Sequence, residues 1–140
     1  LLKRKKTSRP ARRAEPAPPP PAKIYIRMAP FDVALSKGRF RPVAVILEAV
    51  DRPASARICA LEPRVRDALA QGLSLTRLTL KEGRYGLAEA AAPLPGAVNA
   101  AMGSAAAAAA VLTLGERREG KIVFTSAVTS VPDCRNLAGK

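Results

Sequence analysis

The sequence predicts an α+β fold in which an antiparallel or mixed sheet of about three strands carries two helices packed on one face. Three observations predict this class. Two early runs have the two-residue period of strands, two later regions repeat apolar residues at helical spacing, and a final run is rich in β-branched residues. The predicted order is strand, strand, helix, helix, strand (β-β-α-α-β).

The first two strands are predicted over residues 24–35 and 40–50. Apolar residues share one face of the first strand up to Met28, and the alternation restarts after Pro30, so we expect a break there. The second run is apolar on nearly both faces, which predicts a central strand. The short loop around Gly38 favours an antiparallel hairpin.

A helix is predicted to begin at Asp51 and Pro53, because a carboxylate can cap the first turn and proline fits the first helical position. An apolar stripe at three- and four-residue steps follows. Pro63 lies inside this stripe, so we expect it to kink the helix or split it into 53–62 and 63–71. Gly72 is the expected stop.

Alanine dominates the chain from residue 86 onward, which predicts a second, broken helix that restarts near Pro95. The run Ala105–Ala110 is expected to continue this helix, because alanine has the highest helix propensity. Residues 121–131 are β-branched throughout and are bounded by Gly120 and Pro132, so they are predicted to form the third strand.

The charge is concentrated at the N-terminal end. Residues 1–23 contain eight of the 24 basic residues and one of the 11 acidic residues, which is more than half of the net charge of +13. A proline run follows the basic cluster. We therefore expect a disordered, basic, proline-rich linker or membrane-proximal flank over 1–22, one folded domain over 23–131, and a flexible C-terminal tail over 132–140.

The composition excludes much catalytic chemistry. The chain has no histidine and two cysteines. It therefore lacks a histidine base, a histidine-activated nucleophile, imidazole metal ligands and a four-thiolate zinc site. No two acidic residues form a spaced pair in an apolar setting, as acid–base catalysis requires. The sequence therefore predicts no catalytic, cofactor-binding or metal-ligating residue, no cofactor, and a protein that is not an enzyme.

The two cysteines allow two interpretations. Cys59 lies beside the apolar stripe of the first predicted helix, and Cys134 lies in the predicted tail. They are either two unpaired thiols, one of them buried, or a disulfide that ties the tail to the helix in an oxidising compartment. The sequence leaves both interpretations open, because it does not give the separation of the two Cα atoms.

The basic segment allows three interpretations: binding to nucleic acid, binding to anionic lipid, or a solvated flank of a membrane anchor. Phe and Tyr total five in the chain, and none is interleaved with the basic cluster, so nucleic acid is the unlikely partner. No stretch reaches the roughly 18 to 20 apolar residues that span a bilayer. We therefore expect a membrane anchor to lie upstream of residue 1.

Several motifs occur in the order typical of one family. Residues 25–35, Tyr-Ile-Arg-Met-Ala-Pro-Phe-Asp-Val-Ala-Leu, resemble the opening Y-x-x-(M/L)-x-P-F-x-V-N-L of the periplasmic domain of the flagellar basal body-associated protein FliL family. Residues 61–69 resemble its L-P-x-I-R-D-A-L, and residues 120–126 resemble its last strand. The matching residues are Tyr25, Met28, Pro30, Phe31, Val33, Leu35, Leu61, Pro63, Arg66, Asp67, Leu69 and Phe124.

The resemblance implies a single-pass protein of the bacterial inner membrane, with a stomatin-like (SPFH) domain in the periplasm. It implies a homo-oligomeric ring around the stator proteins MotA and MotB, which supports flagellum-dependent motility without catalytic residues. Ala34 replaces the asparagine of the family pattern, which is typical of a divergent paralogue. The cluster Lys3–Lys6 favours the cytoplasmic side under the positive-inside rule, whereas the family places it in the periplasm.

Two other functions also fit the sequence. One is a small basic nucleic-acid-binding module, whose affinity would depend on salt and on residues 1–23. The other is an SPFH-like, membrane-tethered scaffold unrelated to flagella.

Overall fold

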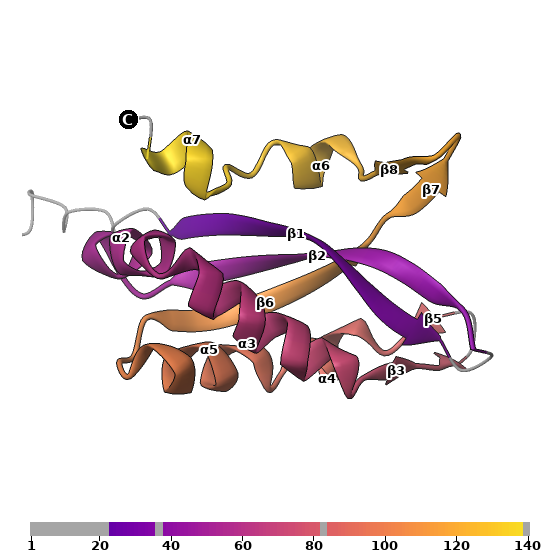
Figure 1. Cartoon of the computed structure of the whole chain (residues 1–140), viewed down its shortest axis with the longest axis horizontal. Coiled ribbons are helices and arrows are strands. Elements are labelled where there is room, and N and C mark those ends of the chain that lie inside the picture. The colour runs from indigo at the N-terminus through magenta and orange to yellow at the C-terminus, as the bar shows by residue number, and fades with distance from the viewer. Residues whose placement is uncertain (1–22, 36–37, 82–83, 139–140) are drawn as a thin grey trace, which may run out of the picture.

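The computed structural model describes residues 23–35, 38–81 and 84–138 (Figure 1). A mixed four-stranded sheet in the order β3-β1-β2-β6 forms the centre, which confirms the α+β class. The main sheet therefore has one more strand than the three predicted. Its strands are β1 (Ile24–Leu35), β2 (Phe40–Ala49), β3 (Arg77–Leu78) and β6 (Ala107–Leu114). The linker predicted over 1–22 lies outside the described residues.

β1 and β2 form the predicted antiparallel hairpin, and β2 is central as expected. The register shifts between Met28 and Phe31, where the Ala29–Pro30 peptide bond is cis. The predicted break is thus an irregularity inside one continuous strand, because proline has no N–H to give to the ladder. Met28, Val45 and Leu47 are fully buried, and they share the face of the sheet that the helices cover.

The first helical region splits as predicted, into α2 (Arg52–Ala60) and α3 (Glu62–Ser74). The Asp51 carboxylate accepts a hydrogen bond of 2.7 Å from the backbone N–H of Ala54, which is the expected cap. Gly72 does not end the helix. A Cβ atom on Gly72 would lie 3.0 Å from Leu94 of the neighbouring helix, so this glycine permits close packing of two helices instead.

The expectation that Ala105–Ala110 continues a helix is wrong. The second helical region is α4 (Leu87–Ala91) and α5 (Leu94–Met102), and the alanine run then enters β6. β6 pairs with β2 along its whole length, from Val43↔Leu114 to Ala49↔Ala107. A central strand needs a neighbour on each side, and that requirement outweighs the helix propensity of alanine.

Residues 121–131 do not form the predicted third strand of the sheet. Only β8 (Lys121–Val123) is extended, and it pairs with β7 (Glu116–Arg118) through a two-residue turn. Both turn residues have positive φ, 51° at Glu119 and 78° at Gly120, as tight hairpins require. Because β6 already occupies the edge of β2, this run pairs locally. A second small hairpin joins β4 (Leu80–Lys81) to β5 (Arg84–Tyr85).

The chain after the sheet, residues 115–138, is called the C-terminal arm. It contains the β7–β8 hairpin, α6 (Ser126–Thr129) and α7 (Cys134–Ala138), and it runs beside β1 (Figure 1). The backbone N–H of Arg27 donates a hydrogen bond of 2.8 Å to the carbonyl of Pro132. A helix with a buried Cys134 therefore lies where the sequence predicted a flexible tail.

Candidate functional site

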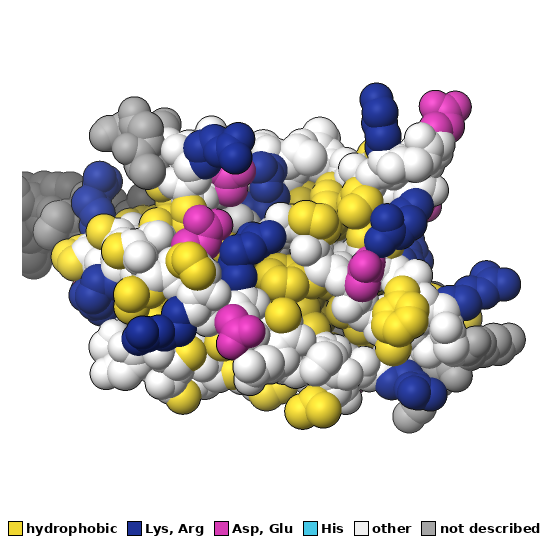
Figure 2. All heavy atoms as spheres, in the orientation of Figure 1, with side chains coloured by type: hydrophobic (Ala, Val, Ile, Leu, Met, Phe, Trp, Pro, Cys, Tyr) yellow, Lys and Arg dark blue, Asp and Glu magenta, His cyan; other side chains and the backbone are white. Residues whose placement is uncertain are grey.

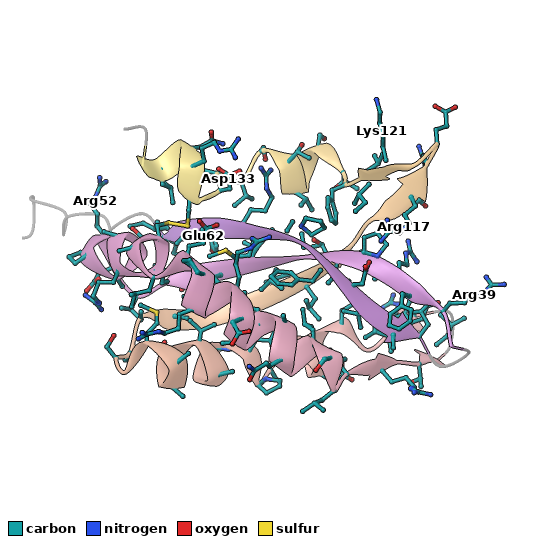
Figure 3. The ribbon with its side chains drawn as sticks, in the orientation of Figure 1. Arg39, Arg52, Glu62, Arg117, Lys121 and Asp133 are labelled. Atoms are coloured by element: carbon teal, nitrogen blue, oxygen red, sulfur yellow. A yellow bond between two sulfur atoms is a disulfide. The ribbon has the colours of Figure 1, made fainter. Side chains whose placement is uncertain are left out.

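A groove of about 1140 Å³ lies between the C-terminal arm, α2 and the beginning of α3. Figure 2 shows hydrophobic side chains gathered between the arm and the helices, with Lys and Arg side chains around them. The apolar lining includes Ala29, Pro30, Ala56, Phe124 and Leu137. The charged lining consists of Arg27, Arg52, Glu62, Arg66, Asp133 and Arg135. Figure 3 shows Glu62 on α3 and Asp133 on the arm.

A disulfide between Cys59 of α2 and Cys134 of α7 closes one part of the groove. The two Cα atoms are 5.3 Å apart, which lies in the usual range for a disulfide. Of the two interpretations that the sequence left open, the structure contains the bonded one. Because the cysteines are 75 positions apart, the bond attaches the arm to a distant helix.

Arg27 attaches the arm to the sheet by its side chain as well as by its backbone. Its Nη1 donates to the carbonyl of Thr129 at 2.6 Å and to that of Val128 at 3.3 Å. Its Nη2 lies 3.4 Å from the Asp133 carboxylate, and the Arg27 side chain is only 19% exposed. The arginine of β1 thus satisfies carbonyl groups of the arm that lack a strand partner there.

Asp133 is held in its charged form. The backbone N–H of Asn136 donates a hydrogen bond of 2.9 Å to the Asp133 carboxylate, and this is the largest cause that lowers the pKa of Asp133. Burial opposes this effect as the second-largest cause, and the nearby Arg27 guanidinium also lowers the pKa of Asp133. The carboxylate therefore serves as a cap for α7 and as the ion partner of Arg27.

Arg66 joins the two best-matching motifs of the sequence. Its Nη2 donates to the carbonyl of Ala29 at 3.1 Å, and its Nη1 lies 3.9 Å from the Glu62 carboxylate. Its guanidinium carbon lies 5.3 Å from the centre of the Phe31 ring, within the range of a cation–π contact. The segments 25–35 and 61–69 therefore meet at this residue, which we call the Arg66 junction.

The structure separates the remaining motif residues. Val33 and Leu69 are fully buried in the core, and Leu35 and Leu61 pack against it. Tyr25 is 39% exposed and pairs with Glu48 across β1 and β2. Pro63 is exposed in the first turn of α3, and exposed Asp67 accepts a hydrogen bond from Gln71 on the same helix. These residues belong to the core or to the exposed surfaces of β1 and α3, and they do not line the groove.

Phe124 lines the groove from just beyond β8, and it lies against the point where the arm leaves the sheet. A Cβ atom on Gly115 would lie 2.6 Å from Cε1 of Phe124. The backbone of Gly115 is also held, because its N–H donates to Pro42 and its carbonyl accepts from Arg41. A glycine is therefore needed where the Phe124 ring crosses the chain.

Sequence reasoning singled out Arg66 but missed Arg27, Arg52, Arg135 and Asp133 of the groove. Arg27 and Arg52 are charged residues at positions that strand and helix patterns treat as surface, so no periodicity marks them. Asp133 and Arg135 flank Cys134, and the cysteine was the available signal. If the disulfide had been assigned from the sequence, Asp133, Cys134 and Arg135 would all have been placed beside α2.

The arrangement offers binding chemistry. Within residues 23–35, 38–81 and 84–138, no group of three or more Cys, Asp and Glu side chains is placed to hold a metal ion. No helix in that part of the chain has the length and apolar character needed to cross a bilayer. Four guanidinium groups and two carboxylates line the groove together with apolar residues, Ser55 and Thr129, which gives it a positive balance.

Comparisons of the chain with protein-family models, with curated proteins and with solved structures found no match. The functional interpretation of the groove and of the Arg66 junction therefore depends on their own geometry. That geometry is a fixed, charged groove formed by one arm and two helices, with its walls connected by a disulfide.

Proposed function

We propose that this chain is a non-catalytic scaffold domain of the FliL type, which stands in the periplasm and supports the stator units of the bacterial flagellar motor. The Arg66 junction is the observation that carries the proposal. Met28, Pro30 and Phe31 belong to one motif and Arg66 to the other, and Arg66 contacts the first segment through Ala29 and Phe31. Two motifs that contact each other in the fold support a common origin with the FliL family better than two unconnected motif matches would.

The disulfide supports the proposed location. Disulfides persist in oxidising compartments such as the bacterial periplasm and are rare in the cytosol. The Cys59–Cys134 bond therefore favours a periplasmic domain, tethered to the inner membrane by an anchor upstream of residue 1. This placement argues against the cytoplasmic orientation that the cluster Lys3–Lys6 would favour.

Assembly into a homo-oligomeric ring around MotA and MotB is part of the proposal, as is the SPFH-like character of the sheet and its helices. Several large apolar side chains are available for such contacts. Leu75 is 91% exposed, Phe40 is 66% exposed and Leu80 is 58% exposed. Residues 116–119, which form β7 and the first turn residue, have no counterpart in the family motifs, in keeping with a divergent paralogue.

Deletion of the gene from its native bacterium tests the proposal. We expect slower swimming and fewer stator units per motor, measured by cell tracking and by fluorescence of labelled MotB. Restoring the wild-type gene should recover both, whereas a gene carrying Arg66→Ala should recover them in part. Unchanged motility in several media would overturn the flagellar role.

A gel shift separates the proposal from the nucleic-acid alternative. The scaffold should show no DNA or RNA binding at physiological salt. Salt-dependent binding that disappears when residues 1–23 are removed would support the basic nucleic-acid module instead. If no nucleic acid binds and the native genome lacks flagellar genes, the remaining interpretation is an SPFH-like scaffold unrelated to flagella.

A further inference from the structure

We propose that the groove beneath the C-terminal arm binds an extended acidic segment of a partner protein, and that Arg52 and Arg135 bind its carboxylates. This inference goes beyond the scaffold role, and it does not depend on the flagellar assignment. It starts from the four arginines of the groove, which fall into two classes.

Two of the four arginines are already engaged inside the protein. Arg27 pairs with Asp133 and with carbonyls of the arm, and Arg66 pairs with Glu62 and with the Ala29 carbonyl. These contacts account for both carboxylates of the groove. They also fix the two guanidinium groups in place, so the positive balance of the groove comes from the other two arginines.

Arg52 and Arg135 are both exposed, and within the described ranges their side chains make no ion pair and no hydrogen bond. Arg52 begins α2 and Arg135 lies on α7, so they line the groove from two different helices. A guanidinium group binds a carboxylate through two parallel hydrogen bonds. Two such groups in one groove can bind two acidic side chains of the same segment.

The groove also presents apolar side chains. Ala56, Pro30, Phe124 and Leu137 provide them. The volume of about 1140 Å³ exceeds the range of about 300–1,000 Å³ that is typical of compact ligands. A chain in extended conformation, with apolar side chains between its carboxylates, matches this combination of length, apolar wall and separated positive charges.

Charge decides among the possible occupants. The basic N-terminal segment of this chain has the same sign of charge as the groove, so it is repelled. A flat bilayer surface meets exposed side chains on a convex face, whereas these guanidinium groups border a groove. The net charge of +13 also attracts an acidic partner at long range. An acidic peptide segment therefore fits better than the chain itself or a membrane.

Fluorescence anisotropy with the whole chain tests this proposal. The probe is a fluorescein-labelled twelve-residue peptide that repeats Glu-Ala-Pro, at physiological ionic strength. The control probe repeats Gln-Ala-Pro and has the same length and stiffness. We expect the acidic peptide to bind at least about tenfold more tightly than the neutral one, because charge-assisted hydrogen bonds are the stronger class.

A matched pair of double variants locates the binding. Arg52→Gln with Arg135→Gln removes two charges from the groove, and we expect about a tenfold loss of affinity. Arg39→Gln with Arg84→Gln removes two exposed charges elsewhere and should change affinity less than about twofold. Arg39 lies at the far end of the molecule from the groove (Figure 3). An equal loss in both variants would overturn the proposal, since it would indicate non-specific attraction.

Two variants at Ala56 test whether misfolding causes the loss of affinity. Ala56 is an exposed α2 residue in the groove, so both Ala56→Glu and Ala56→Lys are compatible with the fold. We expect Ala56→Glu to weaken binding and Ala56→Lys to retain or strengthen it, with unchanged melting curves. If Ala56→Glu strengthened binding and Ala56→Lys weakened it, the groove would be refuted as the binding site. Stronger binding to phosphatidylglycerol vesicles than to the peptide, sensitive to the same variants, would refute a peptide as the ligand.

Discussion

Different interactions stabilise the sheet-and-helix body, residues 24–114, and the C-terminal arm. Fully buried aliphatic side chains such as Leu47, Ile58 and Leu69 fill the body. In the described part of the arm, the buried apolar side chains are those of Val128 and Cys134. The arm is therefore positioned by a few point contacts, among them the disulfide, Arg27, the Arg117–Asp32 ion pair and the Phe124–Gly115 approach.

The groove therefore depends on the C-terminal arm, which is the region held by fewer contacts. A body with a continuous core loses stability when a single buried side chain is shortened, but it keeps its shape through many other contacts. An arm held by point contacts can lose its position while the body stays folded. Changes can therefore be chosen that act mainly on one region.

The largest effect is expected in the body. Leu69→Ala removes a fully buried side chain from α3 and should lower the free energy of unfolding by about 2–5 kcal/mol, measured by urea denaturation. Leu75→Ala is the matched control, because Leu75 is 91% exposed and should cost less than about 0.5 kcal/mol. Similar losses in the two variants would contradict the assignment of the core.

The disulfide should give the next largest effect. Replacing Cys59 and Cys134 by serine should lower stability by about 2–4 kcal/mol. Hydrogen exchange should rise in residues 115–138 far more than in β1 and β2. Wild-type protein treated with a reductant provides the control and should show the same pattern. Uniform exchange across the chain would mean that arm and body form one cooperative unit.

Gly115 should give a smaller effect at the base of the arm. Gly115→Ala places a methyl group against Phe124 and should cost about 1–3 kcal/mol, measured by thermal unfolding. Combining it with Phe124→Leu should recover part of that cost, as expected for residues in direct contact. Gly96→Ala in α5 is the control, since a Cβ there meets nothing within 4 Å and should stabilise by about 0.4–1 kcal/mol.

The smallest effect concerns pH. The folded state lowers the pKa of Asp133, so this carboxylate contributes stability above its unfolded pKa of about 3.9 and loses that contribution as pH falls through the lower folded pKa. Protection of α7 amides from hydrogen exchange, relative to the intrinsic exchange rate at each pH, should therefore decrease below about pH 4 in the wild type. Asp133→Asn should show a weaker dependence. Identical pH profiles would contradict the capping role.

Local chemistry made much of the body predictable. The Asp51 cap, the split at Pro63 and the β1–β2 hairpin each follow from residues that determine their own backbone conformation. The α+β class follows from the same periodic patterns. The core positions of Val33 and Leu69 agree with the strand and helix periods in which they lie.

The misassigned elements depend on partners that are distant in the sequence. Alanine at 107–110 is extended because β2 requires a neighbour, and no local pattern contains that information. Residues 121–131 have strand propensity and β6 has a free outer edge, but Lys121–Val123 pair with the adjacent β7 and Ser126–Thr129 form a short helix. The groove was missed for the same reason, since its walls meet only after the arm returns to α2.

The disulfide also has a mechanical consequence. It closes a covalent ring from Cys59 to Cys134, and the two cysteines are 75 positions apart. Under tension between the two ends of the chain, the polypeptide inside this ring cannot be drawn out while the bond is intact. At about 3.5 Å per residue, roughly 260 Å of contour length is removed from any stretching response. Tension between the two ends therefore runs through β1, β2 and α2 to the disulfide and on to α7, and the helices α3 and α5 with strand β6 are shielded from it.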